Sequence, residues 1–272
     1  MGYLASIDAK KIYWGIGLAV LVILFVFYAP LWAFKTLIAV VSGACLIEFM
    51  NIALPKHPSS APRLGVVLGT VFSVMILFVR DPELWTTGLA AILFITFAYY
   101  LFTQHELDLV LSQIAITIFG CVYVACLFSY AGLLRGLDHG VFWIFILAGC
   151  TFSADTGAYF VGHWMGKHKL APRVSPGKTV EGLIGGVLAS MLAAYVCKLI
   201  FWQGFLDRDA LILGALIGLI GPLGDLSESL IKRSVGVKDS GKLIPGHGGL
   251  LDRLDAVFFT APLVYYYAKF LY

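Results

Sequence analysis

Charged residues are scarce in this chain of 272 residues. Asp, Glu, Lys and Arg together make up 13% of the sequence, whereas soluble domains usually carry about 25%. Hydrophobic residues account for 60%. So little charge beside so much apolar surface excludes an ordinary soluble domain, and the composition therefore predicts an integral membrane protein.

Paired cysteines are absent as a sequence pattern. The five cysteines all lie in apolar stretches, and no two of them have the Cys-x-x-Cys spacing. Cysteine behaves there as a small hydrophobic residue, which argues against a disulfide framework or a zinc site.

A signal-peptide cleavage motif is also lacking. Lys10 and Lys11 precede an apolar run, but no small-x-small sequence follows, so we expect a retained first helix.

Polar linkers are missing too, which predicts one membrane-embedded domain over residues 1–272. About 1–140 would supply N-terminal spans, and about 150–272 would carry the polar segments that are candidates for a functional site. Because a span needs about 20 mostly apolar residues, we expect an all-α, polytopic bundle of about nine transmembrane helices. The candidates lie near 12–29, 31–54, 64–79, 84–103, 109–133, 140–162, 180–202, 210–231 and 255–271, the third and the last being short.

Lys and Arg are distributed unevenly between the two sides that nine spans define. Thirteen of the nineteen fall on the side of the N-terminus and six on the other. Because cytoplasmic loops carry an excess of Lys and Arg, this predicts that the N-terminus lies in the cytoplasm. The two longest basic loops, 163–179 and 232–254, then face the cytoplasm as well, although substrate binding would also explain part of the excess.

Four carboxylates lie within or at the edge of these spans: Glu48, Asp155, Asp225 and Glu228. A carboxylate in the hydrocarbon region costs roughly 3 kcal/mol or more, so each one indicates a functional site. Asp155 lies among small residues in CTFSADTGAYFVG. It either lines a pocket, which we favour, or is hydrogen-bonded to a neighbouring serine or threonine in a helix-packing segment.

The segment GPLGDLSESLIKR places four polar residues on one helical face. They stand at i, i+3, i+4 and i+7: Asp225, Glu228, Ser229 and Lys232. The preceding Gly221, Pro222 and Gly224 would loosen or break the helix. Irregular backbone at membrane depth is tolerated where it lines a cavity, so the segment predicts one.

Asp252 and Asp255 repeat the i, i+3 spacing at the start of the last span. They either stabilise the positive end of that helix or act with Asp225 and Glu228 as ligands of a hard cation. Mg²⁺ is often held by one or two carboxylates plus substrate phosphates. Five basic residues nearby are suited to phosphate oxygens: Lys232, Arg233, Lys238, Lys242 and Arg253.

His247 lies between glycines in PGHGG, where the backbone can approach a ligand closely. A phosphate contact and a loop-ordering role fit this position equally well. Metal ligation ranks third, because no second histidine has ligand spacing.

The loop HKLAPRVSPGKTVEG contains GKT, which invites comparison with a P-loop. That pattern needs a glycine where Pro172 stands, and we expect no strand before it, so the comparison fails. Ser175, Lys178 and Thr179 either bind phosphates in front of a helix N-terminus or form a solvated turn that merely starts the next span.

Residues 229–255, SLIKRSVGVKDSGKLIPGHGGLLDRLD, fill every fixed position of the pattern S-x-x-K-R-x4-K-D-x-G-x2-I-P-x-H-G-G-x-x-D-R-x-D. This stretch resembles the C-terminal signature of phosphatidate cytidylyltransferases, also called CDP-diacylglycerol synthases. The upstream SADTGAYFVGHWMGKHKLAPRVSPGKTVEG resembles the second polar segment of that family. The likeness covers roughly the C-terminal half, from about Ser153, while DAKKIYWG lacks the arginine–threonine opening common in bacterial members.

The resemblance implies an all-helical, dimeric membrane enzyme that condenses CTP with phosphatidic acid to give CDP-diacylglycerol and pyrophosphate. It implies a dependence on Mg²⁺, with a monovalent cation such as K⁺ in the metal centre, and we expect no nucleic-acid partner. Asp225 and Asp252 become the leading metal ligands, with Glu228 and Asp255 nearby. The remaining active-site candidates are Lys232, Arg233, Lys238, Asp239, His247 and Arg253, and the substrate-binding candidates are Asp155, Ser175, Lys178, Thr179 and Ser229.

The residues suit nucleotidyl transfer independently, because the attacking lipid phosphate is already an anion and needs positioning and charge neutralisation rather than a strong base. A CTP-dependent polyprenol kinase stays an alternative, although transfer to an alcohol calls for a base. A sugar-phosphate transferase is conceivable from the carboxylates alone, whereas the D-G-x2-A-R-x8-G-x3-D-x3-D pattern of CDP-alcohol phosphatidyltransferases is absent. A transporter is disfavoured, since transport sites usually lie near the bilayer midplane.

Overall fold

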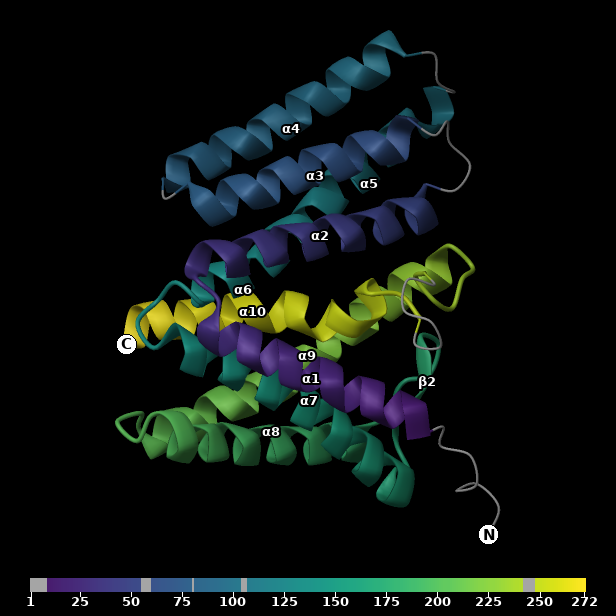
Figure 1. The fold of residues 1–272 in the computed structure, drawn as a ribbon. Coiled ribbons are helices and arrows are strands. Elements are labelled where there is room, and N and C mark those ends of the chain that lie inside the picture. Colours follow the sequence, from purple (N-terminus) through teal and green to yellow (C-terminus); the bar gives the residue numbers. More distant parts are fainter. Residues whose placement is uncertain (1–8, 55–59, 80, 104–106, 242–247) are drawn as a thin grey trace.

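A computed structural model describes residues 9–54, 60–79, 81–103, 107–241 and 248–272 (Figure 1). The predictions for Lys242 and His247 therefore concern residues outside the described part of the chain. Within the described ranges the chain is helical almost throughout, apart from one two-stranded hairpin and short connections.

Nine continuous helical segments form the described structure, in agreement with the apolar runs of the sequence. One of them combines two α-helices with a π-helical segment between them. The segments are α1 (Ala9–Tyr28), α2 (Leu31–Ala53), α3 (Ser60–Phe78), α4 (Pro82–Phe102), α5 (Leu107–Gly120) continued by η1 (Cys121–Cys126) and α6 (Leu127–Leu134), α7 (Gly140–Met165), α8 (Val180–Phe201), α9 (Asp207–Ser234) and α10 (Leu251–Leu271).

Seven of the segments, among the residues described, are long and apolar enough to cross a membrane: α2, α3, α4, the α5–α6 span, α7, α8 and α9. α1 and α10 are not in this set. The first turns of α10 carry Asp252, Arg253 and Asp255, which make it less apolar than the other helices. The structure confirms an all-helical polytopic membrane protein, and nine is an approximate number of spans.

Consecutive segments run in alternating directions through the bundle (Figure 1). α1 begins at the end of the bundle where the hairpin lies and where α9 leads into α10, and α10 finishes at the opposite end. An odd number of crossings produces this arrangement. The basic loop 163–179 and the described parts of 232–254 therefore lie at the same end, as predicted.

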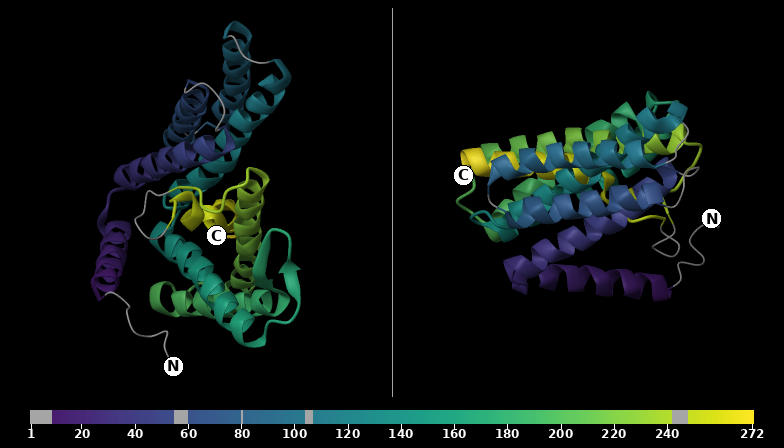
Figure 2. Two further views of the ribbon diagram at one scale, coloured as in Figure 1. Left: turned by 90° about the vertical axis from the view of Figure 1, so that its right-hand side faces the viewer. Right: turned by 90° about the horizontal axis from the view of Figure 1, so that it is seen from above.

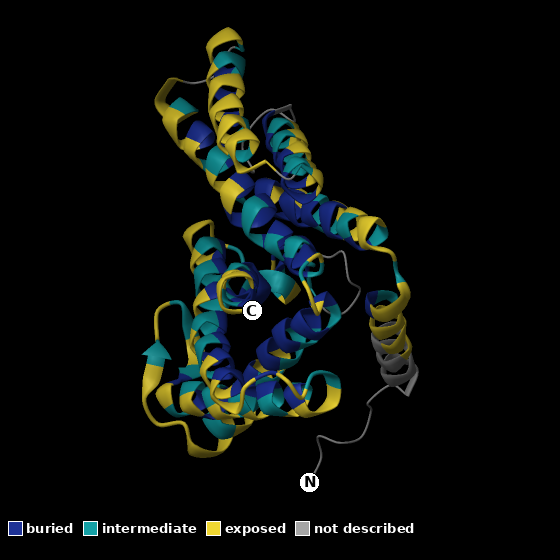
Figure 3. Ribbon diagram, turned by 90° about the vertical axis from the view of Figure 1, so that its left-hand side faces the viewer, coloured by how far each residue is buried: buried dark blue, intermediate teal, exposed yellow. Residues whose placement is uncertain are grey.

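Two groups of helices share one apolar core (Figure 2). α7 packs against α8, α8 against α9 and α9 against α10, while α2 to α6 form the second group and meet α10 through α6. One cluster of buried side chains joins both groups and includes Leu46, Phe128, Trp143, Leu213 and Phe258. The outward faces of the helices are largely exposed and apolar, which suits contact with lipid (Figure 3).

Small residues let α7 and α8 approach closely. A Cβ atom on Gly182 would lie 2.8 Å from the carbonyl oxygen of Ala158, and one on Gly186 would lie 2.8 Å from that of Ala154. Such contacts leave no room for a larger side chain, and small residues are typical of closely packed membrane helices. The close packing holds the end of α7 beside the start of α8.

The segment GPLGD does not break α9, which runs without interruption through Pro222. Proline removes the hydrogen bond to the carbonyl four residues earlier, here that of Gly218, and its ring crowds that turn. Gly218 and Gly221 add no side chains to the crowding, and packed neighbours can accommodate such a residue in a membrane bundle. The prediction of a break is therefore wrong, and Asp225 and Glu228 project from one continuous helix.

A short antiparallel hairpin precedes α8 and consists of β1 (Lys169–Ala171) and β2 (Ser175–Thr179). The expectation that no strand precedes GKT is wrong, because β1 comes before it and GKT itself ends β2. Pro176 and Gly177 are poor strand formers, so local propensity gave no indication of the hairpin. The P-loop comparison still fails, because Pro172 stands where that pattern requires glycine.

Candidate active site

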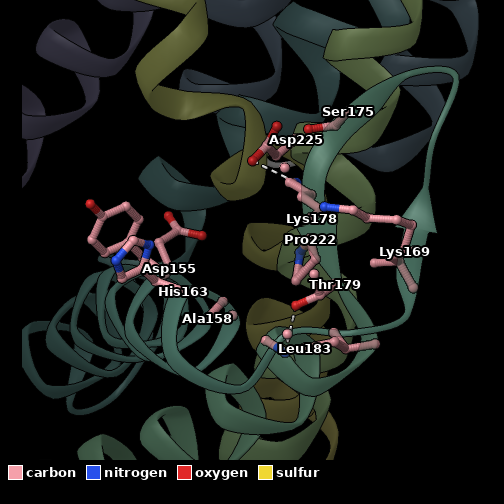
Figure 4. A pocket seen from close by; sticks show the side chains of 16 residues that line it. Asp155, Ala158, His163, Lys169, Ser175, Lys178, Thr179, Leu183, Pro222 and Asp225 are labelled. Carbon is pink, nitrogen blue, oxygen red and sulfur yellow. Dashed lines mark hydrogen bonds and ion pairs between the residues drawn. The ribbon is translucent and has the colours of Figure 1, made fainter.

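An open cavity lies at the end of the bundle that carries the hairpin (Figure 4). Its volume is about 570 Å³, within the range of roughly 300–1,000 Å³ that is typical of small-molecule sites. α7 lines one side, the hairpin and the first turn of α8 line another, and α9 contributes Pro222 and Asp225. Segments far apart in the sequence thus enclose one space.

An ion pair joins the hairpin to α9 inside this cavity. Lys178 Nζ lies 2.6 Å from Asp225 Oδ2, and the two side chains are 24% and 34% exposed. Lys169 and Ser175 line the cavity on the same side (Figure 4). The structure therefore brings together three residues that the sequence singles out, Ser175, Lys178 and Asp225, and adds Lys169 to them.

Asp155 lines the cavity from α7, as Tyr159 and His163 do. Figure 4 shows Asp155 beside His163. In the part of the chain that the structure describes, no hydrogen bond joins its carboxylate to a serine or threonine. This geometry favours the pocket-lining interpretation over the helix-packing one.

Asp255, near the start of α10, adds a third carboxylate to this region. Asp155, Asp225 and Asp255 are close enough to repel one another, and Lys178 partly offsets their charge. Three carboxylates beside one ammonium group leave an excess of negative charge. This arrangement attracts a cation.

Carboxylate oxygens are the donors that Mg²⁺ prefers. Among the described residues, no three His, Cys, Asp or Glu side chains form a group arranged to hold a metal ion. A magnesium site, however, often needs only one or two carboxylates, with substrate phosphates and water completing it. Asp225 and Asp255 supply hard oxygen donors and excess negative charge, so the residues present fit Mg²⁺ held together with a phosphate ligand.

A second polar group is more deeply buried and consists of Glu228, Lys232 and Asp252. Lys232 Nζ lies 2.5 Å from Glu228 Oε2 and 2.7 Å from Asp252 Oδ1. The Glu228 side chain is 2% exposed, and those of Lys232 and Asp252 are 11% and 13% exposed. Glu228 Oε1 is buried and has no hydrogen-bond partner among the described residues. One lysine therefore lies between two carboxylates and offsets only one of their two negative charges.

Backbone amides also hold Asp252. The N–H of Ser240 donates to both of its oxygens at 3.1 Å, and the N–H of Gly249 donates to Oδ2 at 2.8 Å. Gly248, immediately before, has a φ of +84°, and a Cβ there would lie 2.9 Å from Asp252 Oδ2. Glycine is needed at that position because of both the positive φ and the close carboxylate.

The predicted metal ligands thus fall into two neighbouring groups. Asp225 and Asp255 lie near the cavity, whereas Asp252 and Glu228 surround Lys232. Asp255 and Glu228 are close enough to interact electrostatically, which makes the two groups continuous. The assignment of Asp225 and Asp252 as joint ligands of one metal ion stays a prediction.

The other candidate residues occupy varied positions. Ser229 Oγ lies 3.4 Å from Asp225 Oδ1. Thr179 caps α8, because its hydroxyl accepts a hydrogen bond from the N–H of Gly182. It therefore starts the helix, which is one of the two roles expected from the sequence, and it also lines the cavity. Four side chains are exposed at the same end of the bundle: Arg233, Lys238, Asp239 and Arg253.

Glu181 is a residue that the sequence did not single out. Its carboxylate accepts hydrogen bonds from the N–H groups of Lys167 and His168, and it lies 2.6 Å from His168 Nδ1. Glu181 therefore fastens the start of the hairpin to the first turn of α8. Its position three residues after Lys178 was the available signal, but a charged residue at a helix start is common for reasons of helix polarity alone.

Tyr123 is a second such residue, and it lies in η1. Its ring is buried against Phe258, and its hydroxyl has no hydrogen-bond partner in the described part of the chain. The hydroxyl is close enough to Glu228, Asp255 and Asp225 to interact with them electrostatically. π-Helical segments often occur at functional sites, but nothing in the apolar run CVYVAC indicates one.

Comparison with known proteins gives a consistent result. Residues 9–271 match the family model described as the cytidylyltransferase family. A phosphatidate cytidylyltransferase of Synechocystis is 35% identical over 269 residues, covering 88% of this chain and 89% of the relative. A phosphatidate cytidylyltransferase of Bacillus subtilis is 32% identical over 255 residues, covering 92% and 93%. The uncharacterized protein YnbB of Escherichia coli is 32% identical over 265 residues, covering 96% and 86%.

These matches extend over nearly the whole chain, including the N-terminal spans that carry no polar signature. They confirm the resemblance in the C-terminal half. The chain belongs to the cytidylyltransferase family, whose curated members include phosphatidate cytidylyltransferases.

Proposed function

We propose that this protein is a phosphatidate cytidylyltransferase, which condenses CTP with phosphatidic acid to give CDP-diacylglycerol and pyrophosphate. The observation that carries the proposal is the cavity in which Lys178 from the hairpin meets Asp225 from α9. It combines a half-buried cation for phosphate with carboxylates for a metal ion, at one end of a membrane bundle. The names of the Synechocystis and Bacillus subtilis relatives support the choice of substrates.

The reaction is an in-line displacement at the α-phosphorus of CTP. A phosphate oxygen of phosphatidic acid forms the new P–O bond, the bond between the α-phosphorus and the bridging oxygen breaks, and pyrophosphate leaves with that electron pair. The nucleophile is an anion, so no side chain has to remove a proton from it. The protein's task is to position two phosphate groups and to offset their charge.

The chain's own residues can perform these tasks. Lys178, Lys169 and the Ser175 hydroxyl line one side of the cavity and donate to phosphate oxygens. Lys232 is already engaged by two carboxylates, so its role is to hold Glu228 and Asp252 in place beside the cavity. The open mouth of the cavity admits a nucleotide from water, while the lipid chains stay among the helices.

Mg²⁺ is part of the proposal, held by Asp225 and Asp255 together with a substrate phosphate. When bound, it would offset negative charge on the triphosphate. A monovalent cation such as K⁺ is a further proposal that rests on the family resemblance.

We also propose that the hairpin-bearing end faces the cytoplasm of a bacterial inner membrane, where CTP is available. The distribution of Lys and Arg supports this orientation, because the nine spans expected from the sequence would put thirteen of the nineteen on that side. A homodimer is proposed on the resemblance, and cross-linking in native membranes tests it.

The experiment is a pyrophosphate-release assay with purified protein in vesicles that contain phosphatidic acid. We expect release that requires CTP, phosphatidic acid and Mg²⁺, and that Asp225→Asn lowers by about 100-fold or more, because an amide replaces a charged ligand. Asp81→Asn is the matched control, since Asp81 caps α4 far from the cavity and asparagine caps equally well. A folded protein that releases CDP with a polyprenol acceptor instead would establish the kinase alternative.

A further inference from the structure

We propose that Glu48 is a positioning residue of the active site, acting from α2 in the opposite half of the chain. Its carboxylate holds Ser240 and the start of α10, and through them it places Asp252 against Lys232. The effect on kcat rests on the proposed function. The effect on hydrogen exchange rests only on the contacts of Glu48.

Glu48 caps α10 from outside that helix. The N–H of Leu251, the first residue of α10, donates to Glu48 Oε2 at 2.8 Å. The residue at the N-cap, Leu250, provides no side-chain hydrogen bond. The first N–H groups of a helix have no partner within it, and they favour a negative charge. A carboxylate 203 positions away in the sequence therefore does what a local Asp or Ser usually does.

The same oxygen reaches the other side of the loop. Ser240 Oγ lies 3.4 Å from Glu48 Oε2. Glu48 is only 7% exposed, so these contacts are formed away from water. A single buried carboxylate thus connects the chain after α9 to the chain that begins α10.

Gly241 and Gly249 lie close to the carboxylate of Glu48. A Cβ atom on Gly241 would lie 2.5 Å from Glu48 Oε1, and one on Gly249 would lie 2.7 Å from Glu48 Oε2. Both distances are too short for a real side chain. Gly241 is therefore explained by the close approach of Glu48, whereas at Gly249 the hydroxyl of Ser240 would lie even closer to a side chain than Glu48 does.

Glu48 and Asp252 share their partners. Ser240 gives its hydroxyl to Glu48 and its N–H to Asp252, while Gly249 lies against Glu48 and donates its N–H to Asp252. Asp252 in turn binds Lys232 at 2.7 Å. Loss of Glu48 would release Ser240 and the first turn of α10, and Asp252 would lose its fixed position.

The test compares three variants in the full-length protein. Glu48→Ala removes the cap and is expected to lower kcat by roughly 10- to 100-fold, as displacement of site groups by about 1 Å does. Hydrogen exchange of the amides at 249–253 should become faster, while exchange in α7 and α8 stays unchanged. Glu48→Gln keeps an oxygen of the same reach and should recover part of both effects. Glu83→Ala, an exposed glutamate on α4, is the matched control and should change neither.

Gly241→Ala keeps the inference testable where Glu48→Ala does not fold, because the three nearest atoms to a methyl group there all belong to Glu48, so the carboxylate is displaced without being removed. It should reproduce the loss of kcat and the faster exchange at 249–253. Unchanged exchange and unchanged kcat in Glu48→Ala would overturn the inference, and so would a uniform rise in exchange over the whole bundle. An inactive wild type would count against the proposed function only, since the exchange measurement would still decide the role of Glu48.

Discussion

Lys232 is the most informative residue for the energetics of the site, because it is the single cation between two buried carboxylates. We predict that Lys232→Met strongly destabilises the protein. Methionine is one atom shorter than lysine, so the substitution keeps most of the unbranched side chain and removes the ammonium group, which lies 2.5 and 2.7 Å from Glu228 and Asp252. Met is also a good helix former, so α9 itself should be unaffected.

The expected magnitude follows from burial. Breaking a buried ion pair by removing one partner costs about 3–5 kcal/mol, because it leaves an uncompensated charge. Asp252 would keep the N–H groups of Ser240 and Gly249, whereas Glu228 would keep only the side chain of Asp252, a second carboxylate. The cost should therefore fall mainly on Glu228, which is 2% exposed. At about 2–4 °C per kcal/mol for a chain of this size, the melting temperature should fall by roughly 6–20 °C.

The assay is thermal unfolding in detergent, with a double variant as the internal check. Lys232→Met combined with Glu228→Met removes the stranded carboxylate and should recover most of the lost stability, since apolar replacement of a buried pair is often neutral or favourable. Arg208→Ala is the control and should cost less than about 1 kcal/mol, because the Arg208 side chain is 76% exposed and Asp209 keeps its hydrogen bond from Tyr272. The reasoning is refuted if Lys232→Met melts like the wild type, or if the double variant is no more stable than the single one.

Two further predictions concern residues that the sequence did not single out. Glu181→Ala should raise KM for CTP several-fold, because it frees the hairpin that carries Lys178. Little stability should be lost, since the histidine bonded to Glu181 is 79% exposed. An unchanged KM would show that the hairpin does not depend on this contact. Tyr123→Phe should keep or raise the melting temperature, because a buried hydroxyl without a partner costs about 1–3 kcal/mol; a clear fall on thermal unfolding would mean that the hydroxyl is bonded after all.

The helical architecture could be predicted from the sequence because its signals are local. Each span appears as a long apolar run, and loop punctuation such as RDPE between α3 and α4 marks the ends. The common side of the two basic loops follows from counting crossings. The hairpin could not be predicted, because β2 contains Pro176 and Gly177 and depends on its pairing with β1 and on Glu181.

The candidate site could be predicted where charged residues occur in otherwise apolar segments. Carboxylates in apolar helices, such as Asp155 and Asp225, stand out whatever the tertiary structure is, and both line the cavity. The division of the acidic residues into two lysine-bearing groups could not be predicted, because it depends on how α9 and α10 pack. Glu48 stood out by its burial cost, but its partners lie about 200 residues away, and only the folded chain reveals them.

The proposed reaction is tested most directly by following two labels in CTP. Purified protein in vesicles containing phosphatidic acid and Mg²⁺ receives CTP labelled on either the α- or the γ-phosphate. A cytidylyltransferase transfers the α-label to the lipid, as CDP-diacylglycerol, and releases the γ-label as pyrophosphate. Transfer of the γ-label to a lipid, or no labelled lipid from folded protein, would contradict the account.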